Sequence, residues 1–206
     1  MSKKTELGRI EKVTISKSEG KSKKLVEVPL LFYKQSIKLD LPADYNSKID
    51  KFYDSLTEWI KQLNEKVGNI DKIYIESITE TEEAAISQFK KLTDKNERLL
   101  QIIEYFLELG TKIQKTEDKD LILEYLEWVN TANSPEALDI TLEYLLETKK
   151  ERINFIVKRI EETLLDRQIG ILFITLDLQQ EINYPTEIEV IKFRPPVLDD
   201  ILKFLK

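Results

Sequence analysis

Cysteine and histidine are both absent from the 206 residues of this chain. Without cysteine, the protein has no disulfide, no thiolate nucleophile, no iron–sulfur cluster and no cysteine zinc site. Without histidine, it lacks the commonest general base and the commonest transition-metal ligand. Ser-His-Asp and Cys-His catalysis are therefore excluded. Any catalysis would have to rest on carboxylates, lysine, arginine and hard cations such as Mg²⁺.

Glycine is also scarce, and the glycines are far apart. The five are Gly8, Gly20, Gly68, Gly110 and Gly170. Phosphate-binding loops such as G-x-G-x-x-G and the P-loop need several glycines close together, because the backbone must approach the phosphate without side chains in the way. The sequence excludes both loops. We therefore expect no cofactor-binding residue and no catalytic residue from the known motifs.

The balance of charge is acidic. Lys and Arg number 32 against 38 Asp and Glu, which gives a net charge of −6. Because nucleic acid repels an acidic protein at long range, nonspecific DNA binding is not expected. The composition, 41% apolar and 34% charged, is typical of a globular protein with a highly charged surface. Abundant Lys, Glu and Ile with a single Met fits a thermophile's usage, and AT-rich coding gives the same bias.

Long apolar runs are missing as well. No segment approaches about 18 consecutive apolar residues, so no membrane span is expected. The first ten residues, MSKKTELGRI, lack the apolar core of a signal peptide. We therefore expect a cytoplasmic protein that does not associate with a membrane.

The N-terminal region alternates apolar and polar residues. Residues 10–15 and 25–33 have the period-two pattern of strands, and residues 36–41 continue the second strand or form a third. A charged turn lies between the first two segments. This order predicts an N-terminal β-hairpin over residues 1–41, packed on a main domain formed by residues 42–206.

The main domain alternates predicted helices and strands. Residues 42–68 have a helical apolar stripe, and a strand at 72–78 runs into a helix with Thr79 and Glu82 as a capping box. Residues 96–165 are predicted to be helical. The continuous apolar run 169–176 is typical of a strand covered on both faces, with Phe173 in the core. With a strand at 187–193 and a terminal helix, the pattern predicts an α/β fold with a small, mostly parallel sheet.

Acidic residues stand at the predicted carboxyl ends of the strands, where α/β proteins bind ligands. Asp177 follows the buried strand, Glu76 ends the strand at 72–78, and Glu80 comes shortly after it. One interpretation is a Mg²⁺ site with Asp177 and Glu76 as ligands, because hard cations prefer carboxylate oxygen. The other is that Asp177 only closes its strand and pairs with Arg194, at the end of the last strand. In that case Arg194 and Glu80 are candidate partner contacts.

Two predicted helices expose more apolar surface than a small sheet can cover. Residues 121–129 are apolar almost all round, and residues 136–165 form a long helix whose apolar positions only loosely follow a heptad. The long helix braces the sheet or dimerises. We expect a homodimer with helix–helix contact at its centre.

Residues 70–196 resemble an uncharacterised prokaryotic family. The resemblance lies in NERLLQIIEYFLELGTKIQKTEDKDLILEYLEWV, KKERINFIVKRIEETLLDRQIGILFITLD and IEVIKFRPP. The last module of that family is similar to the α/β modules of archaeal and eukaryotic release factor and Pelota relatives. The Gly-Gly-Gln motif of true release factors is absent, so the resemblance does not imply peptidyl-tRNA hydrolysis. It implies the α/β fold and an association with the ribosome or RNA.

Two functions follow from the sequence. The first is a non-enzymatic binding or adaptor protein without a cofactor, whose partner is a protein or a ribonucleoprotein. The alternative is a hydrolase or nuclease that depends on a divalent metal and uses the carboxylates at the strand ends.

Overall fold

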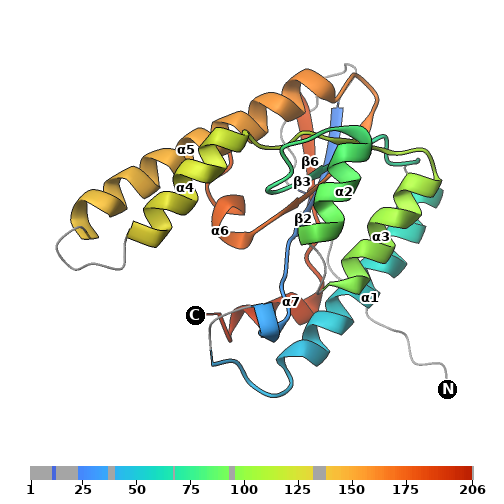
Figure 1. Ribbon diagram of the computed structural model, residues 1–206. Helices are drawn as coiled ribbons and strands as arrows, with labels where there is room; N and C mark the ends of the chain where they lie inside the picture. The colour runs from blue at the N-terminus through green and yellow to red at the C-terminus, as the bar shows by residue number, and fades with distance from the viewer. Residues whose placement is uncertain are drawn as a thin grey trace.

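The protein has the expected α/β fold (Figure 1). The computed structural model describes residues 11–12, 23–36, 40–66, 68–92, 96–131 and 138–205. Within these residues one six-stranded sheet has the order β1-β6-β2-β5-β3-β4, and all neighbours are parallel except β1 and β6. The strands are β1 (Glu11–Lys12), β2 (Lys23–Pro29), β3 (Lys72–Ile75), β4 (Lys112–Gln114), β5 (Ile169–Ile174) and β6 (Ile188–Lys192). The helices are η1 (Lys34–Ser36), α1 (Tyr45–Lys66), α2 (Glu82–Leu92), α3 (Glu97–Glu108), α4 (Lys119–Thr131), α5 (Leu138–Thr163), α6 (Leu176–Gln179) and α7 (Pro196–Leu202).

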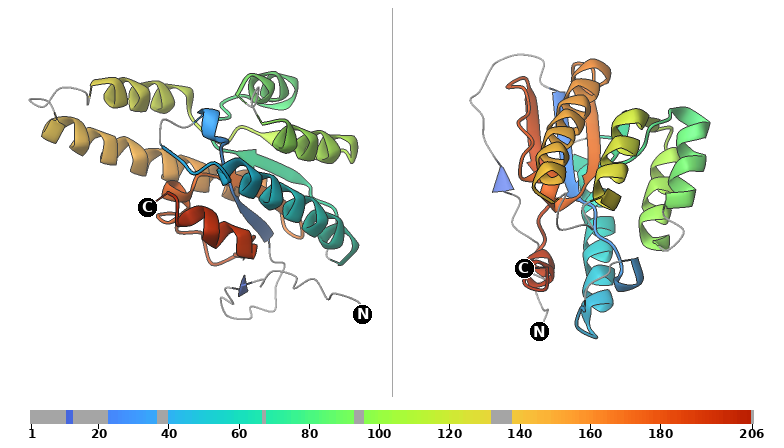
Figure 2. Two further views of the ribbon diagram at one scale, coloured as in Figure 1. Left: turned by 90° about the horizontal axis from the view of Figure 1, so that it is seen from below. Right: turned by 60° about the vertical axis from the view of Figure 1, so that its left-hand side comes forward.

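Helices cover both faces of the sheet (Figure 2). Alternate side chains of the strands point to opposite faces, so Val26 and Phe173 pack in one apolar core while Leu25 and Leu172 pack in the other. The first core includes residues of α1, α2, α3 and α7. The second includes residues of α5 and α6. The prediction that the long helix braces the sheet is confirmed.

Strand β5 lies between β2 and β3, near the middle of the sheet. All six of its residues are buried, and Phe173 is fully buried. The continuous apolar run is explained by this position, because a strand with helices on both sides has no polar face. The predicted central strand is confirmed.

The predicted N-terminal hairpin is wrong. Strands β1 and β2 do not pair with each other, because β6 lies between them and pairs with both. The alternating pattern correctly predicts two strands close in sequence, but their neighbour in space comes from the far end of the chain. Strand β2 is a central strand of the main sheet rather than part of a separate hairpin. A third strand was one possibility for residues 36–41. Ser36 is instead the last residue of η1, and residues 37–39 lie outside the described residues.

Two local predictions in the middle of the chain also need correction. The helical segment predicted over 96–165 contains α3, α4 and α5, but β4 interrupts it and pairs with β3. A strand of three residues is too short to show a period. Thr79 does not form a capping box with Glu82, because its N–H and its hydroxyl donate to Oε1 of Gln88 instead, at 3.0 and 3.4 Å.

Gly170 lets three apolar side chains pack closely at the centre of the sheet. A Cβ atom at this position would lie 3.0 Å from Tyr74, 3.1 Å from Leu25 and 3.3 Å from Leu164. We therefore expect Gly170→Ala to lower the free energy of unfolding by about 1–3 kcal/mol, because the three side chains must move apart. Urea denaturation of the two proteins measures the change. An unaltered midpoint would mean that these three side chains are not tightly packed around Gly170.

Candidate functional site at the carboxyl edge of the sheet

Glu76, one of the two predicted metal ligands, lies at the carboxyl end of β3. Its side chain is almost fully buried. One carboxylate oxygen accepts a hydrogen bond from Arg152 Nη2 at 3.2 Å, and the other accepts from the backbone N–H of Thr175 at 2.7 Å. Glu76 therefore connects β3 both to α5 and to the residue that follows β5.

Arg152 of α5 is the centre of a buried charge cluster. Its Nε and Nη2 donate to the two carboxylate oxygens of Glu117, each at 2.7 Å, and its guanidinium lies 4.8 Å from the centre of the Tyr125 ring. Glu117 is fully buried and also accepts from the backbone N–H of Ser77 at 3.0 Å. This bidentate geometry is the strongest arrangement of arginine and carboxylate. The cluster contains two carboxylates and one guanidinium.

Opposing effects act on the pKa of Glu76 in the Arg152 cluster. Burial raises the pKa of the Glu76 carboxyl above its ordinary value, and the hydrogen bonds from Thr175 act against that rise. The nearby Glu117 carboxylate raises this pKa further, while the positive charge of Arg152 lowers it. Arg152 is thus the counterion that allows two carboxylates to share a buried site.

Sequence reasoning identified Glu76 but missed Arg152 and Glu117. The available signal was an arginine among the apolar positions of a long helix, since a buried arginine must be paired. Its partners could not be found in the same way, because Glu117 and Glu76 lie 35 and 76 residues away along the chain.

Asp177, the other predicted metal ligand, lies in the first turn of the short helix α6. Its Oδ1 accepts a hydrogen bond from the Thr175 hydroxyl at 2.7 Å, and its Oδ2 lies 3.6 Å from Lys149 Nζ. Lys149 also donates to Glu181 at 2.7 Å. The side chain of Asp177 is 61% exposed. Asp177 therefore pairs with a cationic side chain, as the second interpretation of the sequence expects, but that side chain is Lys149.

The identity of that cation was predicted wrongly. Arg194 pairs with Asp199 of α7 at 2.8 Å rather than with Asp177. The prediction assumed that the strands preceding the two residues are neighbours, but β2 lies between β5 and β6. Arg194 and Glu80 are both exposed, as a partner contact requires, and their role as contacts stays a prediction.

The two predicted metal ligands belong to separate ion-pair groups. Glu76 bonds to Arg152, and Asp177 contacts Lys149. Among the residues that the structure describes, no group of three or more acidic side chains is arranged to hold a metal ion. The Mg²⁺ site stays a prediction without support from the geometry of these residues.

A third buried carboxylate, Glu27, lies in the central strand β2. It accepts hydrogen bonds from Gln179 Nε2 at 2.7 Å and from the Tyr184 hydroxyl, and Lys192 Nζ is 3.3 Å away. Burial and the adjacent Glu27 carboxylate hold the pKa of the Tyr184 hydroxyl well above its usual range, so this hydroxyl stays protonated and donates. These bonds fasten the segment between β5 and β6 to the sheet.

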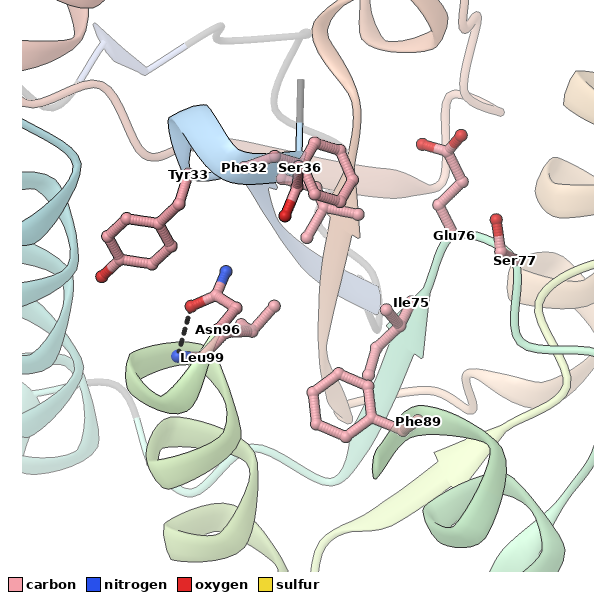
Figure 3. Close-up of a pocket in the computed structure, with 10 residues that line it drawn as sticks. Phe32, Tyr33, Ser36, Ile75, Glu76, Ser77, Phe89, Asn96 and Leu99 are labelled. Carbon is pink, nitrogen blue, oxygen red and sulfur yellow. Dashed lines mark hydrogen bonds between the residues drawn. The ribbon is translucent and has the colours of Figure 1, made fainter. Parts of the chain in front are cut away.

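A pocket of about 150 Å³ lies beyond the carboxyl ends of β2 and β3 (Figure 3). Its wall is mainly apolar and includes Phe32, Ile75 and Phe89. Asn96 also lines it, but its Oδ1 accepts from the N–H of Leu99 at the start of α3, and its amide N–H donates to the Tyr53 hydroxyl at 2.9 Å. The polar group of Asn96 therefore stabilises the fold.

These features define the chain as an α/β protein whose charged groups meet at the carboxyl edge of a parallel sheet. Comparisons with models of known protein families, with curated proteins and with solved structures find no match. The resemblance to the modules of release factor and Pelota relatives stays a prediction. No helix in the described residues combines the length and apolar character needed to cross a membrane.

Proposed function

We propose that the protein is a non-enzymatic binding or adaptor protein of the cytoplasm. The observation that carries this proposal is that the charged groups at the carboxyl edge bond to one another. Arg152 neutralises Glu76 and Glu117, and Lys149 contacts Asp177 and Glu181. A general acid, a general base or a metal ligand must be able to reach a substrate or a cation. Here the buried Glu76 and Glu117 are bonded to Arg152, and the exposed Asp177 is paired with Lys149. Glu76 lines the pocket, but both of its carboxylate oxygens already accept hydrogen bonds. These groups join helix α5 to the strand ends.

A binding role is supported by the apolar surface of two helices. The described residues include ten large apolar side chains that are exposed. Six of the ten belong to α4 and α5: Leu123, Leu126, Val129, Leu142, Tyr144 and Leu146. Single exposed apolar residues are normal, but a cluster of them marks an interaction surface.

The resemblance of residues 70–196 directs the search for a partner to the ribosome and its associated proteins. Sedimentation of a tagged protein through a sucrose gradient tests this part of the proposal. Co-migration with ribosomal particles that survives a salt wash supports it, and a protein confined to the top of the gradient contradicts it.

A thermal-shift experiment separates the binding proposal from the metal-dependent alternative. We expect millimolar Mg²⁺ or Mn²⁺ to leave the melting temperature of the wild-type protein within about 1 °C, because a cation that binds only the folded state must raise it. Asp177→Asn should behave like the wild type. A rise of several degrees that Asp177→Asn abolishes would favour the hydrolase or nuclease.

A further inference from the structure

The apolar stripe of α5 is longer than the sheet that it covers. At spacings of four and three residues, the stripe comprises Leu142, Leu146, Lys149, Ile153, Ile156, Ile160 and Leu164. The last four pack on Leu25, Tyr74 and Leu172 of the sheet. Lys149, paired with Asp177 and Glu181, marks the carboxyl edge. Beyond it, Leu142 and Leu146 are 47% and 57% exposed.

Helix α4 runs beside this overhanging half of α5, and the two helices extend past the sheet as an arm (Figures 1 and 2). We use the term arm for α4 and residues 138–151 of α5. Trp128 stacks on Tyr144 with ring centres 4.4 Å apart, and Tyr125 lies against Arg152. Trp128 and Tyr125 therefore fix the side of α4 that faces α5.

The two helices present their apolar flanks on the same side of the arm. At 3.6 residues per turn, Ile122, Leu126 and Val129 fall on one flank of α4, and Glu124 and Glu127 fall on the other. Because the two helices are antiparallel, the flank of α4 with Leu126 lies on the same side as the α5 stripe with Leu142 and Leu146. Two rows of apolar side chains then lie along the same side of the arm and form one apolar face, as in a helix bundle that lacks one helix.

The charge of the arm restricts what can occupy this apolar face. The arm contains seven acidic residues and three lysines, which gives it a net charge of −4. The acids are Asp120, Glu124, Glu127, Asp139, Glu143, Glu147 and Glu151, and the lysines are Lys119, Lys149 and Lys150. A second copy of the chain would bring two arms of net negative charge together, and nucleic acid would add further negative charge. Charge complementarity therefore favours a basic partner.

We propose that the arm is a docking site for an amphipathic helix with a basic polar face, supplied by another protein. The apolar side of that helix packs on the apolar face formed by Leu126 on α4 and by Leu142 and Leu146 on α5. Its lysines and arginines are attracted by the net negative charge of the arm. This inference rests on the proposed binding function and specifies the chemistry of the partner.

Two model peptides test the docking site. Both are helices of about 18 residues with leucine at every third or fourth position, and their polar faces carry lysine in one and glutamate in the other. Binding to the 206-residue chain is followed by fluorescence anisotropy of the labelled peptide at about 50 mM salt, where charges are weakly screened. We expect the lysine peptide to bind at least tenfold more tightly than the glutamate peptide, about one power of ten in Kd.

Substitutions on the arm provide the decisive comparison. The triple variant Leu126→Gln, Leu142→Gln, Leu146→Gln should weaken binding of the lysine peptide at least about tenfold, because it removes the apolar rows. Its matched control is Leu109→Gln with Leu165→Gln, which changes two exposed leucines (45% and 59%) outside the arm and should leave the affinity unchanged. Glu127→Gln, Glu143→Gln, Glu147→Gln should also weaken the lysine peptide, whereas Glu58→Gln with Glu108→Gln should not.

Three outcomes would overturn the proposal. Equal affinities for the two peptides would remove the charge argument, and equal effects of the arm and control variants would place binding elsewhere. The third outcome concerns light scattering at high micromolar concentration. If the wild type had twice the 24.2 kDa mass and the triple variant were a monomer, the partner on the arm would be a second copy of the chain. None of these results depends on the Mg²⁺ and Mn²⁺ experiment, so failure of the docking site is distinguishable from failure of the non-enzymatic function.

Discussion

Replacing Arg152 with alanine is expected to lower the free energy of unfolding by about 3–5 kcal/mol. Among the described residues, the substitution removes the arginine that forms ion pairs with two buried carboxylates, those of Glu76 and Glu117. It also removes the guanidinium that lies on Tyr125. Because the cluster joins β3 and the start of α4 to α5, the arm is the part of the molecule most affected. Urea denaturation at pH 7 measures the change.

The effect should depend on pH in a defined direction. The pKa of Glu76 in the folded protein is raised above 4.5, its ordinary value. At a pH between 4.5 and this raised pKa, the folded protein therefore holds more protons than the unfolded chain. In this window, stability falls as the pH rises. Arg152 lowers the Glu76 pKa, so its loss moves the upper limit of the window to higher pH. The difference between wild type and Arg152→Ala should therefore shrink on going from about pH 7 to about pH 5.

Two further variants show whether the cost comes from unpaired charge. Arg152→Met keeps much of the side-chain volume but leaves the carboxylates unpaired, so it should remain strongly destabilised. Adding Glu117→Leu to Arg152→Met removes one of those charges and should recover part of the loss, because apolar replacement of a whole buried ion pair is often neutral. A loss below about 1 kcal/mol in Arg152→Ala, or no recovery in the double variant, would contradict the role assigned to the cluster.

The sequence predicted the elements whose pattern repeats locally. The run around Phe173 identified a strand buried on both faces, and the apolar stripe of residues 42–68 identified α1. Each pattern reports on a few neighbouring residues and on the burial of one face. The α/β class followed from the order of such elements, and the structure confirms it.

Pairings between distant segments could not be predicted in this way. The β1 segment is closer in sequence to β2, but it pairs with β6 from the other end of the chain. The same limit explains Asp177 and Arg194, whose pairing requires β5 and β6 to be neighbours, whereas β2 separates them. The ion pairs of Arg152 depend on three elements meeting at one point, and no local spacing encodes that meeting.

Phe173→Ala is expected to cost about 3–5 kcal/mol, because it removes the apolar contacts of a buried ring and leaves a cavity. Phe173 is fully buried in β5, the strand that pairs with both β2 and β3. Its ring belongs to the core shared with α1, α2 and α3, where neighbours held by two layers of structure can relax only partly. For a chain of this size, each kcal/mol corresponds to roughly 2–4 °C in melting temperature.

Two controls make the Phe173 result specific. Phe173→Leu keeps an apolar side chain and should cost clearly less than Phe173→Ala, since the residual cavity is smaller. Leu165→Ala changes a residue that is 59% exposed, and it should stay within about 0.5 kcal/mol of the wild type. Calorimetry or a thermal melt of the three variants gives the order. If Phe173→Ala lowered the melting temperature by only one or two degrees, β5 could not be the central strand on which both cores are built.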